Sequence, residues 1–443
     1  MNPPSSYGIQ NHRYVCCIAC HDLLPTDDVS SLSIAAFVDH TPQSVITTVA
    51  GSGSYGNGGD GGAATFAQLN NPYGVAVDDH ENIFIADYGN SKIRMVTRAG
   101  IITTFAGTGV TGSGGDGGAA IHGQLYYPQA VAVDIISGTV YIADTGNNKI
   151  RVVTKSTGLI TTFAGSSSSY YSSSNLYDCA ATSARLANPF AVAVDRLGNV
   201  YVGSGYSYQY GQVLVVAHDT GFITLLAGCN YCYNYFSGSP LLATSAMLSS
   251  PVGIAVDAHL NVYIATASYS TPYNQVLLVT RGTGMLSVFA GSSTYNGALN
   301  YGDSGLATDA MLGFPSGVCV DFKGNVYISD QQHNNVRVVA NGTGIITTYA
   351  GGGGSYGSLG DGGSATSAYL NRPYGVAVDV QGGGNVFIAD TSDFRIRKVT
   401  NSIDFPTSQP SSRPSIPTSQ PTLQPTGVPS KYVWQPKLEE VGV

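Results

Sequence analysis

The stretch NPYGVAVDDHENIFIADYGNSKIRMVTRAGIITTFAGTG, from Asn71 to Gly109, decides the fold because the chain repeats it. A second clear copy, YPQAVAVDIISGTVYIADTGNNKIRVVTKSTGLITTFAGSS, begins at Tyr127. The aspartate that ends each VAVD-type segment marks six copies about 60 residues apart, at Asp78, Asp134, Asp195, Asp257, Asp321 and Asp379. A supersecondary unit that recurs at this period is typical of a β-propeller blade or a solenoid coil.

Each copy contains four short segments with the patterning of β-strands. In the first copy they span residues 73–78, 83–87, 92–97 and 101–107. Short polar connections between them predict hairpins. The first strand alternates small with branched residues, Gly74 and Ala76 against Val75 and Val77, as expected where several strands crowd around a common axis.

The number of strands predicts how the ring closes. Triplets of strands begin at Tyr73, Gln129, Phe190, Val252, Ser316 and Tyr374, but the sixth triplet ends at Thr400 without a fourth strand. A matching strand, VITTVAG, starts the repeat region at Val45 instead. We therefore predict an all-β, six-bladed β-propeller over residues 45–400. Its blades have four strands, and residues 45–50 close the last blade so that no edge stays open.

Composition narrows the classes of partner. The chain has 443 residues with 56 Gly, 29 Tyr and 10% charged residues, which suits short strands with many turns. A net charge of -8 with 19 Lys and Arg argues against nucleic acid as a partner. No apolar run approaches the roughly 18 residues of a membrane helix, so we expect no membrane insertion.

Both ends differ from the repeats. Residues 1–44 carry no repeat, and their apolar stretch VCCIAC from Val15 is too short for the core of a signal peptide. Residues 401–443 include a tract rich in Pro, Ser and Thr from Asp404 to Ser430, which favours extended polyproline II and predicts a disordered stalk or linker. This tract resembles those of secreted and cell-surface proteins, so we expect an extracellular or cell-surface location.

Several motifs per repeat resemble those of a known family. I-T-T-x-A-G, G-D-G-G, A-x-L-x-x-P-x-G-V-A-V-D, G-N-V-Y-I-A-D and N-x-K-I-R-x-V are similar to NHL-repeat propellers, above all the long-loop variety of the teneurin ectodomain and of bacterial surface proteins. The resemblance covers about four fifths of the chain and implies the six-bladed fold. Proteins of this fold include amidating lyases, lactonase-type hydrolases, RNA binders and adhesion modules, so function has to be argued from a site.

Comparison of the copies with one another predicts a recurring ion pair. An aspartate ends the second strand in four copies, and an arginine follows seven residues later; the pairs are Asp87 and Arg94, Asp144 and Arg151, Asp330 and Arg337, and Asp390 and Arg397. Copies three and four lose both together, with Ser204 and Leu214, then Thr266 and Leu277, in their places. Joint loss indicates that the two residues pair as a structural staple.

The copies that lose this pair gain tyrosines in their loops. Propeller topology places the connections before the first strand and after the second strand on one face. The tyrosines of copies three and four in these connections are Tyr170, Tyr171, Tyr177, Tyr206, Tyr208, Tyr210, Tyr231, Tyr233, Tyr235, Tyr269 and Tyr273. Tyrosine mixed with Ser, Gly and Asn is typical of recognition surfaces, which predicts a protein or glycan site; the alternative is drift in degenerate blades.

Evidence for metal or cofactor chemistry is weak. Loop acids recur at Asp60, Asp116, Asp178, Asp303 and Asp361, where calcium is one interpretation and capping of a short helical turn is the one we prefer. The six VAVD-type aspartates are interpreted as turn formers, and the alternative is a ring of six near the axis that holds a cation. The residues expected to face the channel, Tyr73, Gln129, Phe190, Val252, Ser316 and Tyr374, include no histidine or carboxylate. We therefore predict no metal site and no cofactor.

The seven cysteines leave the redox compartment open. CIACH, from Cys17 to His21, fits the C-x-x-C-H pattern of haem attachment, but the pattern is short and no haem is expected. Cys179, Cys229 and Cys232 lie in neighbouring loops and are candidates for a disulfide, whereas Cys319 is expected to be a buried free thiol. Asn341 begins an accessible glycosylation sequon.

Together these observations favour a non-enzymatic binding or adhesion propeller that recognises a protein or glycan through the tyrosine-rich loops of blades 3 and 4. The first alternative is a secreted metal-dependent hydrolase or lyase of the six-bladed class. The second is a purely structural or sensor domain.

Overall fold

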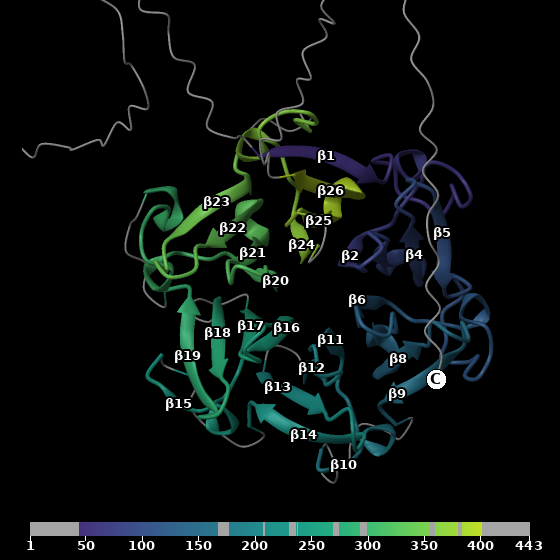
Figure 1. Cartoon of the computed structure of the whole chain (residues 1–443), viewed down its shortest axis with the longest axis horizontal. Coiled ribbons are helices and arrows are strands. Elements are labelled where there is room, and N and C mark those ends of the chain that lie inside the picture. The colour runs from purple at the N-terminus through teal and green to yellow at the C-terminus, as the bar shows by residue number, and fades with distance from the viewer. Residues whose placement is uncertain are drawn as a thin grey trace, which may run out of the picture. The chain divides into compact units, whose positions relative to one another are not determined.

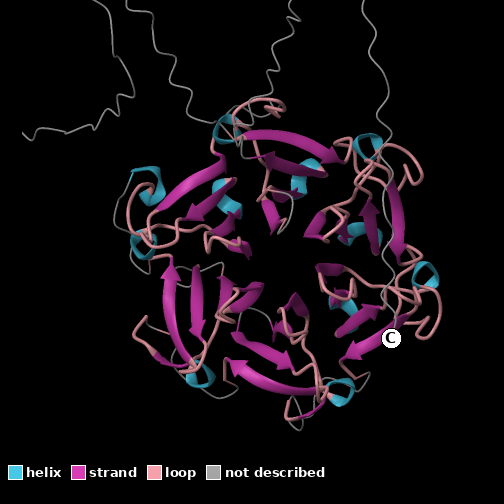
Figure 2. Cartoon of the chain, viewed as in Figure 1, coloured by secondary structure: helices cyan, strands magenta, loops and turns pink. Residues whose placement is uncertain are grey.

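Six antiparallel sheets surround a common centre as the blades of a propeller (Figure 1). The computed structural model describes residues 44–166, 177–206, 209–229, 236, 238–268, 274–292, 299–353, 359–379 and 383–400. Figure 2 shows strands in every blade and short helical turns in the connections. The predicted all-β, six-bladed propeller with four-stranded blades is confirmed.

Each blade runs from an inner to an outer strand. The innermost strands of blades 1 to 6 are β2 (Pro72–Val77), β6 (Pro128–Val133), β11 (Pro189–Val194), β16 (Ser250–Val256), β20 (Pro315–Val320) and β24 (Pro373–Val378). The second strands are β3 (Ile83–Asp87), β7 (Val140–Asp144), β12 (Val200–Tyr206), β17 (Val262–Ala267), β21 (Val326–Asp330) and β25 (Val386–Asp390). The third strands are β4 (Lys92–Val96), β8 (Lys149–Val153), β13 (Gln209–Val216), β18 (Gln275–Thr280), β22 (Asn335–Val339) and β26 (Arg395–Thr400).

The outer strands complete the blades. They are β5 (Ile102–Ala106), β9 (Ile160–Ala164), β14 (Phe222–Ala227), β19 (Met285–Ala290), β23 (Ile346–Gly351) and, for blade 6, β1 (Val45–Ala50). Two-residue strands β10 (Cys179–Ala180) and β15 (Leu241–Leu242) add a fifth strand to blades 3 and 4. Single bridges such as Ala63 to Ile101 and Leu306 to Ile345 occupy the same outer position elsewhere. The connection that precedes each blade thus reaches round to its outer edge.

Short 3₁₀ turns lie in two kinds of connection. Before the innermost strands these are η1 (Ala64–Phe66), η3 (Ala120–His122), η5 (Ala181–Ser183), η6 (Ala243–Ser245), η8 (Ala307–Asp309) and η10 (Ala365–Ser367), and η7 (Leu299–Gly302) precedes η8. Between second and third strands they are η2 (Tyr88–Asn90), η4 (Thr145–Asn147), η9 (Gln331–His333) and η11 (Thr391–Asp393). Blades 3 and 4 have no such turn among their described residues, and β12 and β13 instead extend until Tyr206 pairs with Gln209.

The N-terminal strand closes the ring. β1 pairs antiparallel with β26, with Val45 opposite Thr400 and Ile46 opposite Val399, and the two strands lie side by side in Figure 1. Ile46 is fully buried in the core between blades 5 and 6. This pairing confirms the predicted closure of the last blade by residues 45–50. The closure is favourable because, without β1, the edge of β26 would leave its backbone groups unpaired.

The described residues form seven hydrophobic clusters, six of them between two neighbouring blades and a small seventh one of Val252, Ala267 and Phe314. The innermost strands approach most closely, which explains their small residues. A Cβ atom on Gly375 would lie 2.4 Å from the carbonyl oxygen of Tyr73 in the next blade, and one on Gly317 would lie 2.4 Å from that of Tyr374. Glycine is required at these positions by contact with the neighbouring backbone.

The VAVD-type aspartates form turns, as predicted. Asp257 Oδ1 accepts hydrogen bonds from the backbone N–H of His259 and Asn261, each 2.8 Å long, and its Oδ2 accepts one from the Asn261 side chain. Asp195 and Asp321 make the same pattern with Asn199 and Asn325. These carboxylates hold the connection between first and second strands.

Candidate functional site

The four predicted Asp–Arg partners are parts of larger buried clusters. Arg94 Nη1 lies 3.4 Å from Asp87 Oδ2, and both side chains have no exposed surface. A second carboxylate comes from the connection before the blade, since Asp60 Oδ1 lies 2.7 Å from Arg94 Nη2. Thr104 on β5 donates a hydrogen bond of 2.6 Å to the other Asp60 oxygen. We call each such group of one arginine and two aspartates a triad.

The triad recurs in the four ordinary blades. Its inner aspartate lies between 3.3 and 3.6 Å from the arginine and its outer aspartate lies closer; the other members are Asp144, Arg151 and Asp116, then Asp330, Arg337 and Asp303, and finally Asp390, Arg397 and Asp361. The outer aspartate therefore fastens the long connection to the blade that it covers.

This geometry corrects our interpretation of the loop acids. We expected Asp60, Asp116, Asp178, Asp303 and Asp361 to cap the following 3₁₀ turns, but η1, η3, η5, η8 and η10 have no side-chain hydrogen bond at their N-caps. The capping expectation is wrong, and for Asp60, Asp116, Asp303 and Asp361 the reason is that a buried guanidinium offers the carboxylate a stronger, charged partner. The sequence contained a usable signal: Asp60, Asp116, Asp303 and Asp361 occur in the same four copies as the arginine.

Burial acts differently on the two carboxylates of a triad. Loss of hydration raises the pKa of Asp87 and Asp144 to about 6 and that of Asp390 to about 7. Although burial also acts on Asp116, its hydrogen bond from Thr162 and the charge of Arg151 lower its pKa overall. In the blade 2 triad, burial thus raises the pKa of the inner Asp144 while the outer Asp116 has its pKa lowered, so a proton binds the inner carboxylate in preference.

Blades 3 and 4 replace the triad with uncharged groups. Ser204 Oγ accepts the backbone N–H of Ala187 at 3.0 Å, the bond that Asp87 Oδ1 accepts from Asn70 in blade 1. Leu214 is buried in place of the arginine, and Tyr177 packs against the same cluster. Asp178 donates its N–H to Ile223, as Gly61 does to Ile102, so Tyr177 rather than Asp178 occupies the position of Asp60. In blade 4, buried Phe236 and Leu277 share one cluster.

Most of the tyrosines that we predicted as a binding surface lie outside the described residues. These are Tyr170, Tyr171, Tyr208, Tyr231, Tyr233, Tyr235, Tyr269 and Tyr273. Tyr206 and Tyr210 lie on β12 and β13, while Tyr177 is half-buried against the core. The strands that lead into these loops are placed: Ser204 on β12 pairs with Pro189, and Ala267 on β17 pairs with Ser250. The connections that follow β12 and β17 therefore leave the blades beside the starts of β11 and β16, whereas those with Tyr170, Tyr171, Tyr231, Tyr233 and Tyr235 follow the outer strands β9 and β14.

The cysteines and the sequon have definite environments where they are described. Cys229 is disulfide-bonded and Cys179 is a free thiol, so Cys179 is not part of the predicted disulfide; Cys232 lies outside the described residues. Cys319 is buried and free, as predicted, and burial raises its pKa, which keeps the thiol protonated. Asn341 is exposed in the hairpin between β22 and β23. The C-x-x-C-H stretch from Cys17 lies outside the described part of the chain.

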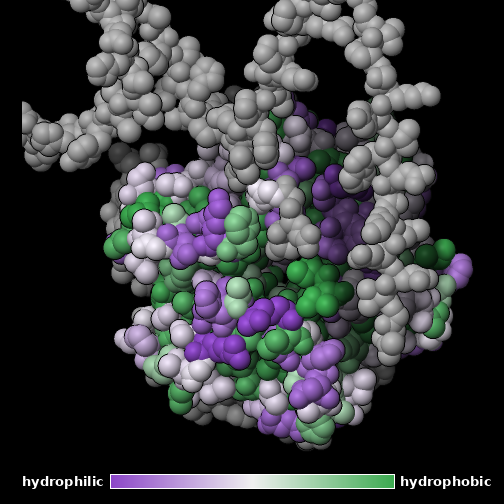
Figure 3. All heavy atoms as spheres, viewed as in Figure 1, coloured by the Kyte–Doolittle hydropathy of each residue, from purple (hydrophilic) through white to green (hydrophobic). Residues whose placement is uncertain are grey.

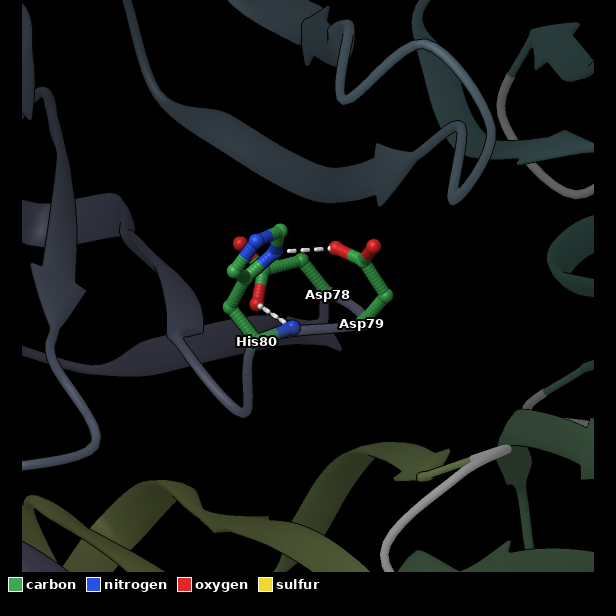
Figure 4. Close-up of side chains that lie close together, drawn as sticks. All are labelled: Asp78, Asp79 and His80. Atoms are coloured by element: carbon green, nitrogen blue, oxygen red, sulfur yellow. Dashed lines mark hydrogen bonds and ion pairs between the residues drawn. The ribbon is translucent and has the colours of Figure 1, made fainter. Parts of the chain in front are cut away.

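One group of possible metal ligands occurs among the described residues, Asp78, Asp79 and His80 after β2 (Figure 4). His80 Nδ1 lies 2.5 Å from Asp79 Oδ1. Asp78 accepts hydrogen bonds from the N–H groups of His80 and Asn82 and from the Asn82 side chain. These are the same hydrogen bonds that the other VAVD-type aspartates make, so Asp78 belongs to the turn that recurs between the first and second strands.

A channel of about 240 Å³ runs between the innermost strands and is lined largely by their Ala, Val and Gly residues. Figure 3 shows hydrophobic residues around the centre of the face turned to the reader. The six residues expected to face the channel line either it or its opening at the starts of these strands: Tyr73, Gln129, Phe190, Val252, Ser316 and Tyr374. That prediction is confirmed.

The opening widens into a cavity of about 400 Å³, which we call the channel mouth. Its aromatic lining is Tyr73, Tyr88, Phe190, Phe314 and Tyr374. Its polar lining is Gln129, Asn188, Ser250, Gln331, Gln332 and Arg372. The described residues around this cavity include no carboxylate and no histidine. Such a mixture of aromatic rings and amides is typical of a recognition pocket.

Five tyrosines lie in a row from the channel mouth across blade 1 to the start of blade 2; the first four are stacked and Tyr126 is tilted by 35° against Tyr127. Neighbouring ring centroids lie 4.4 to 4.8 Å apart in the order Tyr374, Tyr73, Tyr88, Tyr127 and Tyr126. Burial and the neighbouring phenols Tyr73 and Tyr127 raise the pKa of Tyr88, which keeps its hydroxyl a hydrogen-bond donor. We call this row the tyrosine stack. Tyr73 and Tyr374 occupy the same repeat position, but the other rings come from different positions in the connections, so the repeat pattern does not reveal that the five lie in one row.

No helix in the described part of the chain is long and apolar enough to cross a membrane.

Comparison with known proteins agrees with the repeat motifs. Residues 47–113 match the family model of the teneurin NHL domain. Teneurin-m of Drosophila melanogaster is 30% identical over 221 residues, which cover 47% of this chain and 8% of that protein. Suppressor of Quenching 1, chloroplastic, of Arabidopsis thaliana is 25% identical over 278 residues, 61% of this chain and 25% of that protein. The chain thus spans a quarter or less of these relatives.

Solved structures share the fold. A structural genomics protein of unknown function from Bacteroides thetaiotaomicron superposes with a TM-score of 0.57 at 19% identity, covering 81% of this chain and 76% of that one.

Proposed function

Because this chain is a six-bladed β-propeller of the NHL type, we propose that it is a non-enzymatic binding module that recognises a protein or glycan at the channel mouth and the adjoining tyrosine-rich loops of blades 3 and 4. The resemblance to NHL propellers that the motifs indicated is confirmed, and it shows the fold without naming a ligand.

The lining of the channel mouth is the observation that carries the proposal. A hydrolase or lyase needs acids, bases or metal ligands where its substrate binds. The described residues around the mouth instead supply five aromatic rings, four side-chain amides, a serine and one arginine. These groups offer contact area and hydrogen bonds but no general base, which supports recognition over catalysis.

Two of the tyrosine-rich connections begin next to this cavity. Strands β12 and β17, which lead into them, pair with Pro189 and Ser250, and Asn188 and Ser250 line the mouth. Blades 3 and 4 replace the triad with apolar contacts of Leu214 and Leu277, so their connections are not fastened by an outer aspartate. Long loops of Tyr, Ser, Gly and Asn then suit adaptable contacts with a large ligand.

We further propose that the chain acts outside the cell or at its surface, with residues 401–443 as an extended stalk. The support is compositional, since closely spaced prolines keep a chain extended and prevent a packed core.

The test is binding to an array of proteins and glycans with the unmodified chain and with Tyr208, Tyr233 and Tyr269 all changed to Ser. We expect retention on at least one ligand and its loss in the triple variant, because each truncation removes aromatic contact area. Tyr55→Ser serves as a matched control, since Tyr55 is 74% exposed and does not line the mouth. Equal retention of the triple variant and the unmodified chain would refute the role of the loops.

A further inference from the structure

We propose that the channel mouth is a saccharide site that takes an acidic sugar, with Arg372 pairing with its carboxylate and the stacked tyrosines and amides holding its hydroxyl groups. This inference rests on the proposed function and narrows its ligand to one class.

The polar lining matches the chemistry of a sugar. A sugar hydroxyl both donates and accepts hydrogen bonds, and a side-chain amide offers both capacities in one group. Gln129 on β6 and the adjacent Gln331 and Gln332 of η9 bring three such amides to the cavity, and Gln129 Oε1 already lies 3.5 Å from the Tyr374 hydroxyl. A purely apolar ligand would leave these amides without hydrogen bonds, at a cost in affinity.

The tyrosine stack gives the cavity a rigid aromatic wall. Tyr73 is stacked between Tyr374 and Tyr88, at centroid distances of 4.4 Å to each, so its ring cannot turn independently of its neighbours. Rings held in this way lose little conformational entropy when a ligand binds. The faces of Tyr73 are covered by its neighbours, so these rings offer a sugar their phenol hydroxyls as hydrogen-bond partners.

Arg372 sets the expected charge of the ligand. Its side chain lines the mouth and makes no ion pair with any residue that the structure describes. No carboxylate lines the cavity in the described residues, so the guanidinium is the one formal charge there. A planar guanidinium binds a carboxylate through two parallel hydrogen bonds, which favours a uronic or sialic acid over a neutral sugar.

Arg372 has a left-handed backbone conformation, which is unfavourable for a residue with a side chain. Arg372 has φ +51° immediately before Pro373, and its N–H donates a 2.8 Å hydrogen bond to Asn334 Oδ1. Asn188 and Phe314 line the mouth from equivalent positions before Pro189 and Pro315, with φ +42° and +57°. Asn71 and Tyr127, before Pro72 and Pro128, have the same positive φ, so this backbone conformation belongs to the repeat. The strained positions aim three different side chains into one cavity.

The experiment uses three matched pairs of probes: trigalacturonate with its methyl ester, 3′-sialyllactose with lactose, and a hyaluronan hexasaccharide with chitohexaose. We expect calorimetric titration of the full chain to show at least one acidic member binding tenfold or more tightly than its neutral counterpart. Arg372→Gln should remove that preference, and Tyr88→Ser should weaken both members of the pair.

Arg98→Gln and Tyr55→Ser are the matched controls, because both side chains are about three-quarters exposed and neither lines the mouth; their affinities should equal that of the unmodified chain. Gln332→Ala, at an exposed mouth residue, gives a further test if Tyr88→Ser shifts the melting curve. Absence of binding by all six probes, equal affinity within every pair, or unchanged binding by Arg372→Gln would each overturn the inference. A protein ligand lost only in the loop variant would then leave the proposed function standing.

Discussion

Each buried arginine of blades 1, 2, 5 and 6 lies between two carboxylates, and this arrangement decides how those blades respond to substitution. The Arg94 side chain has no exposed surface. It forms one ion pair with Asp87 of its own blade and another with Asp60 in the connection that precedes the blade. Removing one member of such a cluster leaves an uncompensated charge, whereas exchanging the whole cluster for apolar residues does not.

We predict that Arg94→Leu lowers the free energy of unfolding by about 3 to 5 kcal/mol, because Asp87 then stays buried without its cation. The control is the full blade 3 pattern, Asp60→Tyr, Asp87→Ser, Arg94→Leu and Thr104→Leu together, which should recover most of that loss. Urea unfolding monitored by circular dichroism measures both. A quadruple variant no more stable than Arg94→Leu would contradict the role that we assign to Leu214 and Tyr177.

The same triads predict a pH dependence. Asp87, Asp144 and Asp390 have folded-state pKa values of about 6, 6 and 7, above the ordinary 3.8 of the unfolded chain. The folded chain therefore binds more protons between pH 4 and 7, so this stabilisation is complete below about pH 4 and is lost as pH rises through 6 to 7. Asp116, whose pKa is lowered, acts in the opposite sense at lower pH.

We accordingly expect the Tm to rise as pH falls from 7.5 to 5.5, measured by calorimetry in buffers of equal ionic strength. A chain in which Asp87, Asp144 and Asp390 are changed to Asn should lose most of this slope. A Tm that falls steadily over that interval would show that these carboxyl groups are ionised in the folded protein.

At the scale of elements, close packing of the innermost strands restricts their sequence. A Cβ atom added to Gly375 on β24 would lie only 2.4 Å from the Tyr73 carbonyl oxygen, so a methyl group fits there only if the backbone shifts. Blade 2 has Ala130 and blade 3 has Ala191 in the same register, so the ring is not uniformly tight.

We predict that Gly375→Ala lowers the free energy of unfolding by about 1 to 3 kcal/mol through overpacking. The reverse change, Ala130→Gly, removes only one methyl group and should cost about 1 kcal/mol. Both are measured by urea unfolding. Equal stability of Gly375→Ala and the unmodified chain would mean that blades 1 and 6 can separate freely.

The sequence predicts the strands and the ring closure, but it does not predict which connections fold over which strands. The strands and closure followed from repetition, because period-two patterning and turn residues are local signals. The partners Asp87 and Arg94 were found because they vanish together, yet Asp60 was misread as a cap since nothing local shows that its connection folds back over β4. The tyrosine stack was missed for the same reason: Tyr88 and Tyr127 meet only once two blades stand side by side.

For the whole molecule, closure by β1 is the property most open to test. Deletion of residues 1–50 removes β1 and exposes the backbone edge of β26 together with the cluster that Ile46 completes. We expect the Tm to fall by at least about 5 °C, since each kcal/mol lost shifts the Tm of a chain this large by roughly 2 °C. Deletion of residues 1–43, which keeps β1, should leave the Tm unchanged, and equal melting of the two truncated chains would contradict the closure.

The seam between β1 and β26 also has a consequence for biosynthesis. A hydrogen bond joins Thr400 to Val45 across 355 positions of the chain. A ribosome that adds roughly 5 to 20 residues per second makes the first strand some 20 to 70 s before its partner. During that interval Ile46 has no core to enter, and five finished blades present an open edge to other nascent chains. A message truncated within its last blade therefore yields a product in which β1 has no partner strand and the open propeller exposes unpaired backbone groups.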